Sequence, residues 1–155
     1  MTDREYMQRA IELASFAERE GDVPVGAVLC VGDLTIERWN RKEATNNATA
    51  HAELLAIVEA SRILGRWRLH DATLYCTKEP CAMCAGAIVA ARVGRVVYAA
   101  SDPKGGADGG TFEILRSPKT NHRPEVLAGL MEEEASAQLV AFFRARREGN
   151  RGASG

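Results

Sequence analysis

The sequence lacks any long apolar run, and its first residues carry charge where a signal peptide would have an apolar core. It also lacks an excess of either charge, because its 155 residues have a formal net charge of -1. We therefore expect a cytoplasmic protein that does not enter a membrane. Global attraction to a polyanion is excluded as well, so any binding of nucleic acid requires a local basic patch.

Internal repeats and interdomain linkers are also absent. One domain is therefore expected over residues 1–147, and the polar tail over residues 148–155 is expected to be disordered. Cysteine is scarce, and the four cysteines of a protein in a reducing compartment are better explained as ligands or buried thiols than as disulfides. Only Cys81 and Cys84 have the spacing of metal ligands, whereas Cys30 and Cys76 lie in apolar, strand-like runs.

Apolar runs of strand length alternate with stretches of helical period. Strands are predicted over residues 25–31, 34–39, 72–77, 93–99 and 124–130, and helices over residues 3–19, from an N-cap at Thr49 to a stop at Gly65, and over residues 81–91 and 132–147. Residues 40–48 are predicted to be a loop, and the glycine-rich residues 104–110 a mobile loop. In the second helix we expect Leu54, Leu55 and Val58 to face inward. The alternation implies a single three-layer α/β domain, with helices on both faces of one mixed sheet.

A group of three potential zinc ligands is the most informative pattern in the chain. It consists of His51, Cys81 and Cys84, and three protein ligands leave one tetrahedral position open, which is typical of catalytic zinc. Glu53 lies two residues after His51, and on a helix this separation points the two side chains apart. Glu53 is therefore expected to act as an acid and base beside the zinc. His-x-Glu followed by Pro-Cys-x-x-Cys is the signature of zinc nucleobase deaminases.

Each part of this pattern has a simpler explanation when taken alone. Cys-x-x-Cys also occurs in redox pairs and in structural zinc sites, and a glutamate in the first turn of a helix is often a solvated charge. A redox pair, however, explains neither His51 nor Glu53. A structural zinc site needs a fourth ligand, for which only His70 and His122 remain, and neither has paired ligand spacing. The helix that begins near Cys81 favours its thiolate, and the same argument extends to Cys84.

Beyond these motifs, the chain resembles the bacterial tRNA-specific adenosine deaminases over most of its length. The matching segments are residues 24–27, 39–40, 49–53, 79–81, 84–87, 94–98, 100–102, 121–123 and 142–147. The resemblance implies the five-stranded sheet of the cytidine-deaminase-like fold, a homodimer, and conversion of the wobble adenosine of a tRNA anticodon loop to inosine. The chain departs from the family's pattern at Asn47-Ala48, where Asp-Pro is usual, and at Lys78, where Leu is usual.

The resemblance also implies contacts between the flipped nucleotide and Asn40, Asp102 and Asn121. For each of these residues a role in turning or capping the backbone is the open alternative. The last helix carries aromatic and basic side chains of the kind that bind RNA, namely Phe142 or Phe143, Arg144, Arg146 and Arg147. Cations at the C-terminal end of a helix also interact favourably with its dipole, which is the alternative explanation for the arginines.

The sequence thus predicts a hydrolytic deaminase with one Zn²⁺ per subunit and no organic cofactor. In this hypothesis an activated water attacks C6 of adenine, while Glu53 moves the protons. Two other functions share part of the evidence. A zinc deaminase of a free base such as guanine or cytosine would have the same four motif residues without the RNA patch. A non-catalytic RNA-binding module with structural zinc would need a fourth ligand and would leave Glu53 unexplained.

Overall fold

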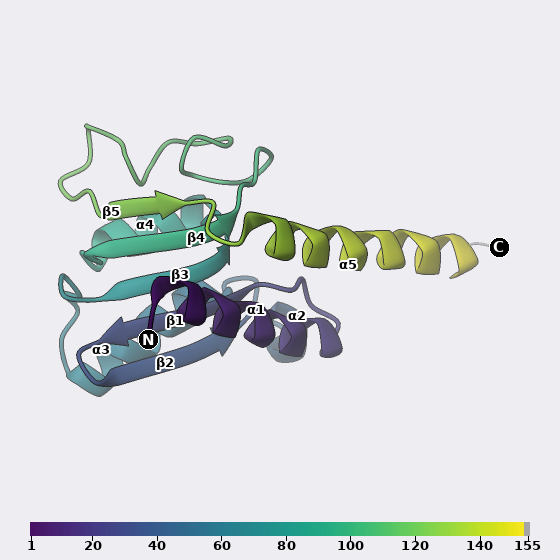
Figure 1. The fold of residues 1–155 in the computed structure, drawn as a ribbon, viewed down its shortest axis with the longest axis horizontal. Helices are drawn as coiled ribbons and strands as arrows, with labels where there is room; N and C mark the ends of the chain where they lie inside the picture. The colour runs from purple at the N-terminus through teal and green to yellow at the C-terminus, as the bar shows by residue number, and fades with distance from the viewer. Residues whose placement is uncertain (154–155) are drawn as a thin grey trace.

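The computed structural model describes residues 1–153 and contains a sheet with helices on both faces. The helices are α1 (Asp3–Arg19), α2 (Lys42–Thr45), α3 (Ala52–Leu64), α4 (Ala82–Ala90) and α5 (Glu132–Ala153), and the strands are β1 (Gly26–Val31), β2 (Leu34–Trp39), β3 (Thr73–Lys78), β4 (Arg95–Ala100) and β5 (Glu125–Ala128). In Figure 1, α1 lies in front of the sheet and α3 and α4 lie behind it, whereas α5 starts at the right-hand end of the sheet and projects away from it. The start of α5 packs into the same core as α1. The predicted fold class is therefore confirmed.

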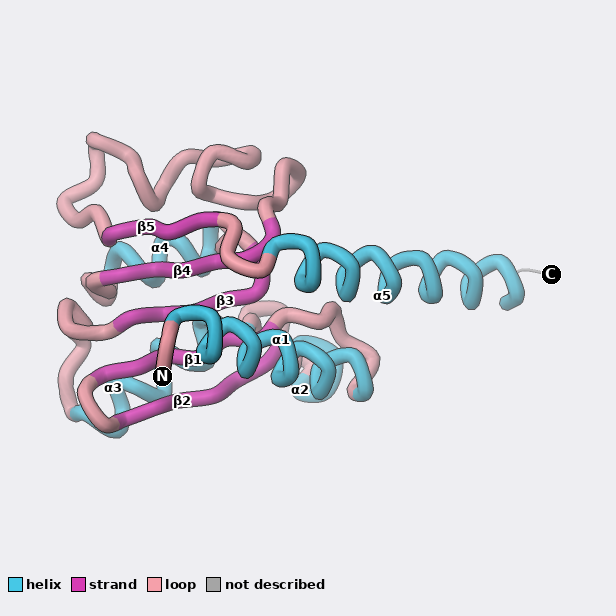
Figure 2. The backbone as a smooth tube through the Cα atoms, viewed as in Figure 1, coloured by secondary structure: helices cyan, strands magenta, loops and turns pink. Residues whose placement is uncertain are grey.

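The sheet is mixed, with the strand order β2-β1-β3-β4-β5. β1 is antiparallel to both β2 and β3, whereas β3, β4 and β5 are parallel to one another. The turn between β1 and β2 contains Gly32 with φ 56°, a left-handed conformation that glycine adopts without steric cost. α4 connects β3 to β4, and a long loop over residues 101–124 connects β4 to β5 (Figure 2). Parallel strands need such crossover connections.

Both faces of the sheet are buried, which explains why β1 reads as a continuous apolar run. Val28 points into the core beneath α1 and α5, together with Met7 and Val97. Its neighbour Leu29 points into the opposite core, beneath α3 and α4. Successive side chains of a strand alternate between faces, so one strand contributes to both cores.

The segment that leads into α3 differs from the prediction. Residues 40–48, predicted to be a loop, contain the short helix α2. α3 begins later than predicted, with His51 as its N-cap residue in place of Thr49. The hydroxyl of Thr49 donates a hydrogen bond to the side-chain oxygen of Asn47 and does not cap the helix. The first N–H group of α3, that of Ala52, donates instead to the side-chain oxygen of Asn40 at 2.8 Å. A residue distant in sequence thus provides the cap that Thr49 was expected to provide.

The predicted inward face of α3 was wrong. Val58 is 59% exposed, and Leu54 and Leu55 are only partly buried. The sheet is covered instead by small residues and one carboxylate: Ala52, Glu53, Ala56, Ile57 and Ala60. The alanines leave room for α3 to approach the sheet closely, and Ile57 is the one large aliphatic side chain of this face, whereas Val58 remains on the outer side of the helix.

The last helix extends further than the residues 132–147 predicted for it. α5 continues to Ala153 and so enters the segment 148–155 for which disorder was predicted, and residues 154–155 lie outside the described part of the chain. Extending an existing helix costs much less than nucleating one, and Arg144 to Glu148 are good helix formers. Within residues 1–153, no helix has both the length and the apolar character that a bilayer crossing requires.

Candidate active site

The three predicted zinc ligands converge at the starts of two neighbouring helices. His51 is the N-cap residue of α3, Cys81 is the N-cap residue of α4, and Cys84 lies in the first turn of α4. The two helices contact each other on the same face of the sheet. Nδ1 of His51 consequently lies 3.6 Å from the Sγ atom of Cys81 and 3.6 Å from that of Cys84. The three potential ligand atoms all lie within 4.8 Å of one another.

These distances fit a tetrahedral zinc ion. With Zn–N and Zn–S bonds of roughly 2.1 and 2.3 Å, tetrahedral angles place a nitrogen and a sulfur ligand about 3.6 Å apart. One imidazole and two thiolates are also a donor set that zinc prefers. Among the described residues, no fourth His, Cys, Asp or Glu joins this group. His70 is exposed, and Nε2 of His122 makes a 2.7 Å hydrogen bond to the carbonyl of Val93.

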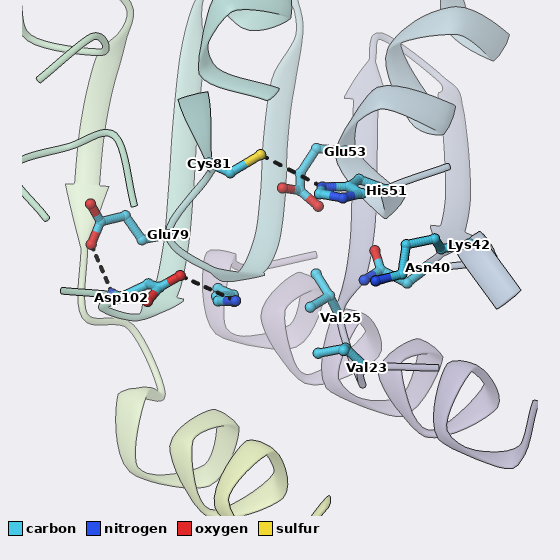
Figure 3. Close-up of a pocket in the computed structure, with 10 residues that line it drawn as sticks. Val23, Val25, Asn40, Lys42, His51, Glu53, Glu79, Cys81 and Asp102 are labelled. Carbon is cyan, nitrogen blue, oxygen red and sulfur yellow. Dashed lines mark hydrogen bonds and ion pairs between the residues drawn. The ribbon is translucent and has the colours of Figure 1, made fainter. Parts of the chain in front are cut away.

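The carboxylate of Glu53 lies beside the three ligands without being one of them. It points into the space shared with His51 and Cys81 (Figure 3). The residue is only 4% exposed, and within the described structure its Oε1 atom has no hydrogen-bond partner. Burial raises the pKa of this carboxyl group above its ordinary value. A buried, unpaired polar atom is costly for stability, so its position next to a metal-ligand group indicates a reaction site.

The two cysteines differ in their electrostatics. Hydrogen bonding from Cys84, and then from His51, lowers the pKa of Cys81 to about 3. The same contact with Cys81, together with burial, raises the pKa of Cys84. Ready ionisation was expected for Cys81 and, by the same reasoning, for Cys84, so for Cys84 the direction is opposite to that expectation. The reason is that the first thiolate disfavours a second one nearby until a cation compensates both.

An open cavity of about 150 Å³ leads to these residues. Asn40 and Lys42 lie on one side of it, and Glu79 and Asp102 lie on the opposite side (Figure 3). Val23 and Val25 contribute apolar surface between the two sides. The lining is therefore mostly polar and charged, with one aliphatic patch, and it offers many hydrogen-bonding groups to a polar ligand.

Comparison with known proteins identifies the family. Residues 1–100 match the family described as the cytidine and deoxycytidylate deaminase zinc-binding region. The tRNA-specific adenosine deaminase of Bacillus subtilis (strain 168) is 48% identical over 147 residues, which span 94% of this chain and 91% of that protein. The chain belongs to the tRNA-specific adenosine deaminases. This finding confirms the resemblance inferred from the sequence.

Solved structures agree with this assignment. A structure from a study of A-to-I editing by tRNA:A34 deaminases superposes on this chain with a TM-score of 0.82 at 42% sequence identity. The superposition covers 87% of this chain and 99% of the other. A guanine deaminase from Bacillus subtilis superposes less closely, with a TM-score of 0.63 at 32% identity, over 96% of this chain and 95% of the other. The shared fold thus extends to deaminases of free bases, but the similarity is greater to the tRNA deaminases.

The structure brings some of the predicted substrate contacts together and leaves others apart. Asn40 and Asp102 line the cavity that contains His51 and Glu53. Phe143 and Arg147 line a neighbouring groove. Asn121 is exposed and lines neither the cavity nor the groove, so the structure does not bring it together with the other predicted contacts.

The remaining predicted contacts lie on the outer half of α5. Arg144 and Arg146 are exposed there, and the guanidinium group of Arg146 lies 5.3 Å from the ring centre of Phe142. The structure also shows which of the two adjacent phenylalanines, Phe142 or Phe143, is available at the surface. Phe142 is 9% exposed and packs inward, whereas Phe143 is 39% exposed.

Sequence reasoning did not assign a role to Glu79, although it belongs to a segment that matched the family. Its buried carboxylate accepts hydrogen bonds from the backbone N–H groups of Asp102, Asp108 and Gly110 at 2.9, 2.8 and 3.1 Å. Residues 104–110, expected to be a mobile loop, are thus fastened to the end of β3. The signal available in the sequence was the position of Glu79 directly before Pro80 and Cys81.

Proposed function

We infer that this chain is a zinc-dependent deaminase that converts adenosine to inosine at the wobble position of a tRNA anticodon loop. The observation that carries this function is the buried Glu53, whose Oε1 atom has no hydrogen-bond partner among the described residues, beside the three potential ligands His51, Cys81 and Cys84. The name of the Bacillus subtilis relative supports tRNA as the substrate class. The RNA contacts named below are part of the same proposal.

The zinc ion would be held by His51, Cys81 and Cys84. When bound, zinc acts as a Lewis acid that makes water a nucleophile at neutral pH. Glu53 accepts a proton from the attacking water at its carboxylate. It delivers this proton to the adenine ring nitrogen, then takes the remaining proton of the new C6 hydroxyl group and passes it to the leaving amine, so that water is consumed and ammonia is released. A buried carboxyl group with a raised pKa is suited to this shuttle because it holds a transferred proton more readily than a solvated carboxylate does.

Two residues of the cavity wall are proposed to position the target nucleoside. The side-chain oxygen of Asn40 is already bonded to Ala52, so its amide N–H groups remain available to the base or ribose. The carboxylate of Asp102 is proposed to accept a hydrogen bond from the ribose 2′-OH, the group that distinguishes RNA from DNA. An anticodon loop suits this cavity because its unstacked bases can turn out of the strand.

The outer half of α5 is proposed to bind the RNA around the target. Phe143 is exposed beside Arg147 in a groove next to the cavity, so a base can stack on the ring while the arginine contacts a phosphate. Arg144 and Arg146 extend the same basic surface along the helix. This local concentration of cations offsets the absence of a positive net charge.

A homodimer is proposed from the apolar outer side of α3 and α4. Val58 of α3 and Met83 of α4 are exposed, and Leu54 and Leu55 are partly exposed near the start of α3. A second copy of the chain would bury this surface. Val58→Glu is expected to convert a dimer to a monomer in light scattering, and a wild-type chain that is monomeric at micromolar concentration would refute the proposal. A cytoplasmic location is proposed because tRNA with an accessible anticodon loop is found there.

The proposed function is tested by mapping inosine in total tRNA after incubation with the purified, zinc-loaded protein. We expect inosine at the wobble position of one or a few tRNA species, and no inosine with Glu53→Ala. A parallel panel of guanine, cytosine and free adenosine separates the tRNA deaminase from a deaminase of free bases. Turnover of a free base without any tRNA editing would overturn the proposal in favour of that second function, which the structural likeness to guanine deaminase makes worth testing.

A further inference from the structure

Lys78 and Asp102 form an ion pair at the boundary between two recesses of the surface. Their Nζ and Oδ2 atoms are 3.1 Å apart. Lys78 ends β3 and Asp102 follows β4, and because these strands are adjacent and parallel, both residues emerge at the same edge of the sheet. Both line the cavity with His51 and Glu53, and both also line the groove with Phe143 and Arg147. The ion pair therefore belongs to the wall that the two recesses share.

The groove has the chemistry of a binding site for one nucleotide. Among the described residues, its lining contains the cations Lys78, Lys104 and Arg147 against the single carboxylate of Asp102. The rest of the lining is apolar or aromatic, and it includes Leu139 and the partly exposed Phe143. A surplus of positive charge next to an aromatic surface suits a phosphate joined to a stacked base.

We propose that Lys78 binds the phosphate that joins the target adenosine in the cavity to the adjacent nucleotide in the groove. This inference rests on the proposed function, because it requires a polynucleotide substrate. A strand with one base in each recess must pass over the shared wall. At that point its phosphate approaches the carboxylate of Asp102, so a cation is needed to make the crossing favourable. The ammonium group of Lys78 is at this position.

Asp102 does not depend on Lys78 for its own position. Its Oδ1 atom accepts hydrogen bonds from the backbone N–H groups of Lys104 and Gly105, both at 3.2 Å. Its own N–H group is held by Glu79. The side chain of Lys78 is 31% exposed, so the ammonium group can contact a phosphate while it remains near Asp102. A lysine ammonium has three donors and can serve both acceptors.

The first test compares steady-state kinetics of the zinc-loaded wild type, Lys78→Met and Lys78→Arg on an anticodon stem-loop RNA. Lys78→Met is expected to lower kcat/KM about tenfold through KM, with kcat near the wild-type value, and to reduce the slope of log(kcat/KM) against log[salt] by about one. Lys78→Arg should retain most of the wild-type efficiency. The matched control Lys119→Met removes an exposed lysine from the loop over residues 101–124 that lines neither recess, and it should change neither quantity.

The second test separates a phosphate contact from simple neutralisation of Asp102. Neutral methylphosphonates replace the linkages on either side of the target, one at a time, each compared with an otherwise identical oligonucleotide carrying the ordinary phosphate. We expect one of these replacements to lower wild-type kcat/KM about tenfold and to have little effect on Lys78→Met. Equal losses in both proteins, or full recovery of activity in Lys78→Met combined with Asp102→Asn, would overturn the inference. Failure of the wild type to deaminate the unmodified stem-loop would instead overturn the proposed function on which the inference rests.

Discussion

The backbone N–H group of Asp102 donates a 2.9 Å hydrogen bond to the buried carboxylate of Glu79. This contact connects the end of β3 to the loop that follows β4. Gly106 lies so close to Glu79 that a Cβ atom at this position would be 2.2 Å from the carboxylate carbon. The side chain of Glu79, which is not among the proposed zinc ligands or proton carriers, therefore positions the part of the cavity wall that contains Asp102.

Glu79→Gln is expected to lower the free energy of unfolding by about 2 kcal/mol. The glutamine amide has only one oxygen, and its NH2 group would face backbone donors, leaving at least one buried N–H group unpaired. The displacement of Asp102 should also lower kcat/KM. Urea denaturation and kinetics on the stem-loop measure both effects. Glu113→Gln is the control, because its exposed carboxylate accepts from Arg116 at the surface, and equal stability of the two variants would contradict the role of Glu79.

Substitutions of Asn40 are expected to separate capping of α3 from recognition of the substrate. Asn40→Ala removes the acceptor for the Ala52 N–H group and should cost about 1–2 kcal/mol of stability. Asn40→Asp keeps that acceptor but loses the amide N–H groups, so it should retain most of the stability while losing activity. Thermal unfolding and kcat/KM provide the two readouts. Full activity in Asn40→Asp would show that the side chain acts only as a cap.

Glu53→Gln is expected to retain close to one zinc ion per chain while losing turnover by a factor of about 10²–10⁴. The carboxylate is not one of the three ligand atoms, and removing its buried negative charge should not destabilise the fold. Zinc analysis, denaturation and deamination rates are measured on the same preparation. Glu59→Gln serves as a control because that carboxylate lies on the same helix in surface ion pairs. Near-wild-type turnover in Glu53→Gln would exclude the proposed proton shuttle.

Cys84→Ser is expected to lose both zinc and stability. An ion that binds only the folded chain stabilises it by roughly 3–4 kcal/mol when its free concentration is 100 to 1,000 times its Kd. The serine variant should therefore unfold at the lower temperature that the wild type shows after chelation, and added zinc should shift only the wild type. Cys30→Ser is the control, because Cys30 lies outside the ligand group. A zinc-dependent rise in stability of Cys84→Ser would argue against this ligand.

The pH dependence of stability should contain a contribution from Asp3. This carboxylate accepts from Arg95 at 2.7 and 2.9 Å and from the Tyr75 hydroxyl at 2.6 Å, and these hydrogen bonds lower its pKa to about 2. Because the folded pKa is below the ordinary value of 3.8, the contribution is present above about pH 4 and is lost as the pH falls towards 2. At neutral pH it should be about 1 kcal/mol after allowance for partial exposure.

Urea denaturation of the wild type and Asp3→Asn between pH 2 and pH 7 tests this contribution. The difference in unfolding free energy should be largest and constant near neutral pH, and it should shrink below pH 4. A difference that is independent of pH would show that Asp3 contributes through packing or neutral hydrogen bonds alone.

The sequence predicted most secondary elements and the convergence of the ligands because both follow from local patterns. The apolar period defined α1, and the spacing of Cys81 and Cys84 is that of residues in one helical turn. His51 could be added because His-x-Glu and Cys-x-x-Cys together have one chemical explanation. In the structure, the starts of α3 and α4 lie side by side and bring these residues together.

Several of the failures involve contacts between distant parts of the chain. Thr49 was a reasonable cap for α3, but Asn40 supplied the acceptor from a position 12 residues before Ala52. The inward face of α3 was assigned to its largest aliphatic side chains, whereas the buried position of Glu53 defines the actual face. The contacts of Glu79 bridge 23 to 31 residues, and no local period signals them. Whether Asn121 contributes to substrate binding stays a prediction, although it does not line the cavity.

The way α5 is attached has an evolutionary consequence. Ala135 near its start and Phe142 midway pack against the body, and beyond them the helix projects past the edge of the sheet (Figure 1). Mutations in the projecting half can therefore accumulate without disturbing the ion-binding residues or the two cores. Selection could retarget the enzyme to a different polynucleotide by altering this arm alone, and an engineer could exchange it between homologues as a module.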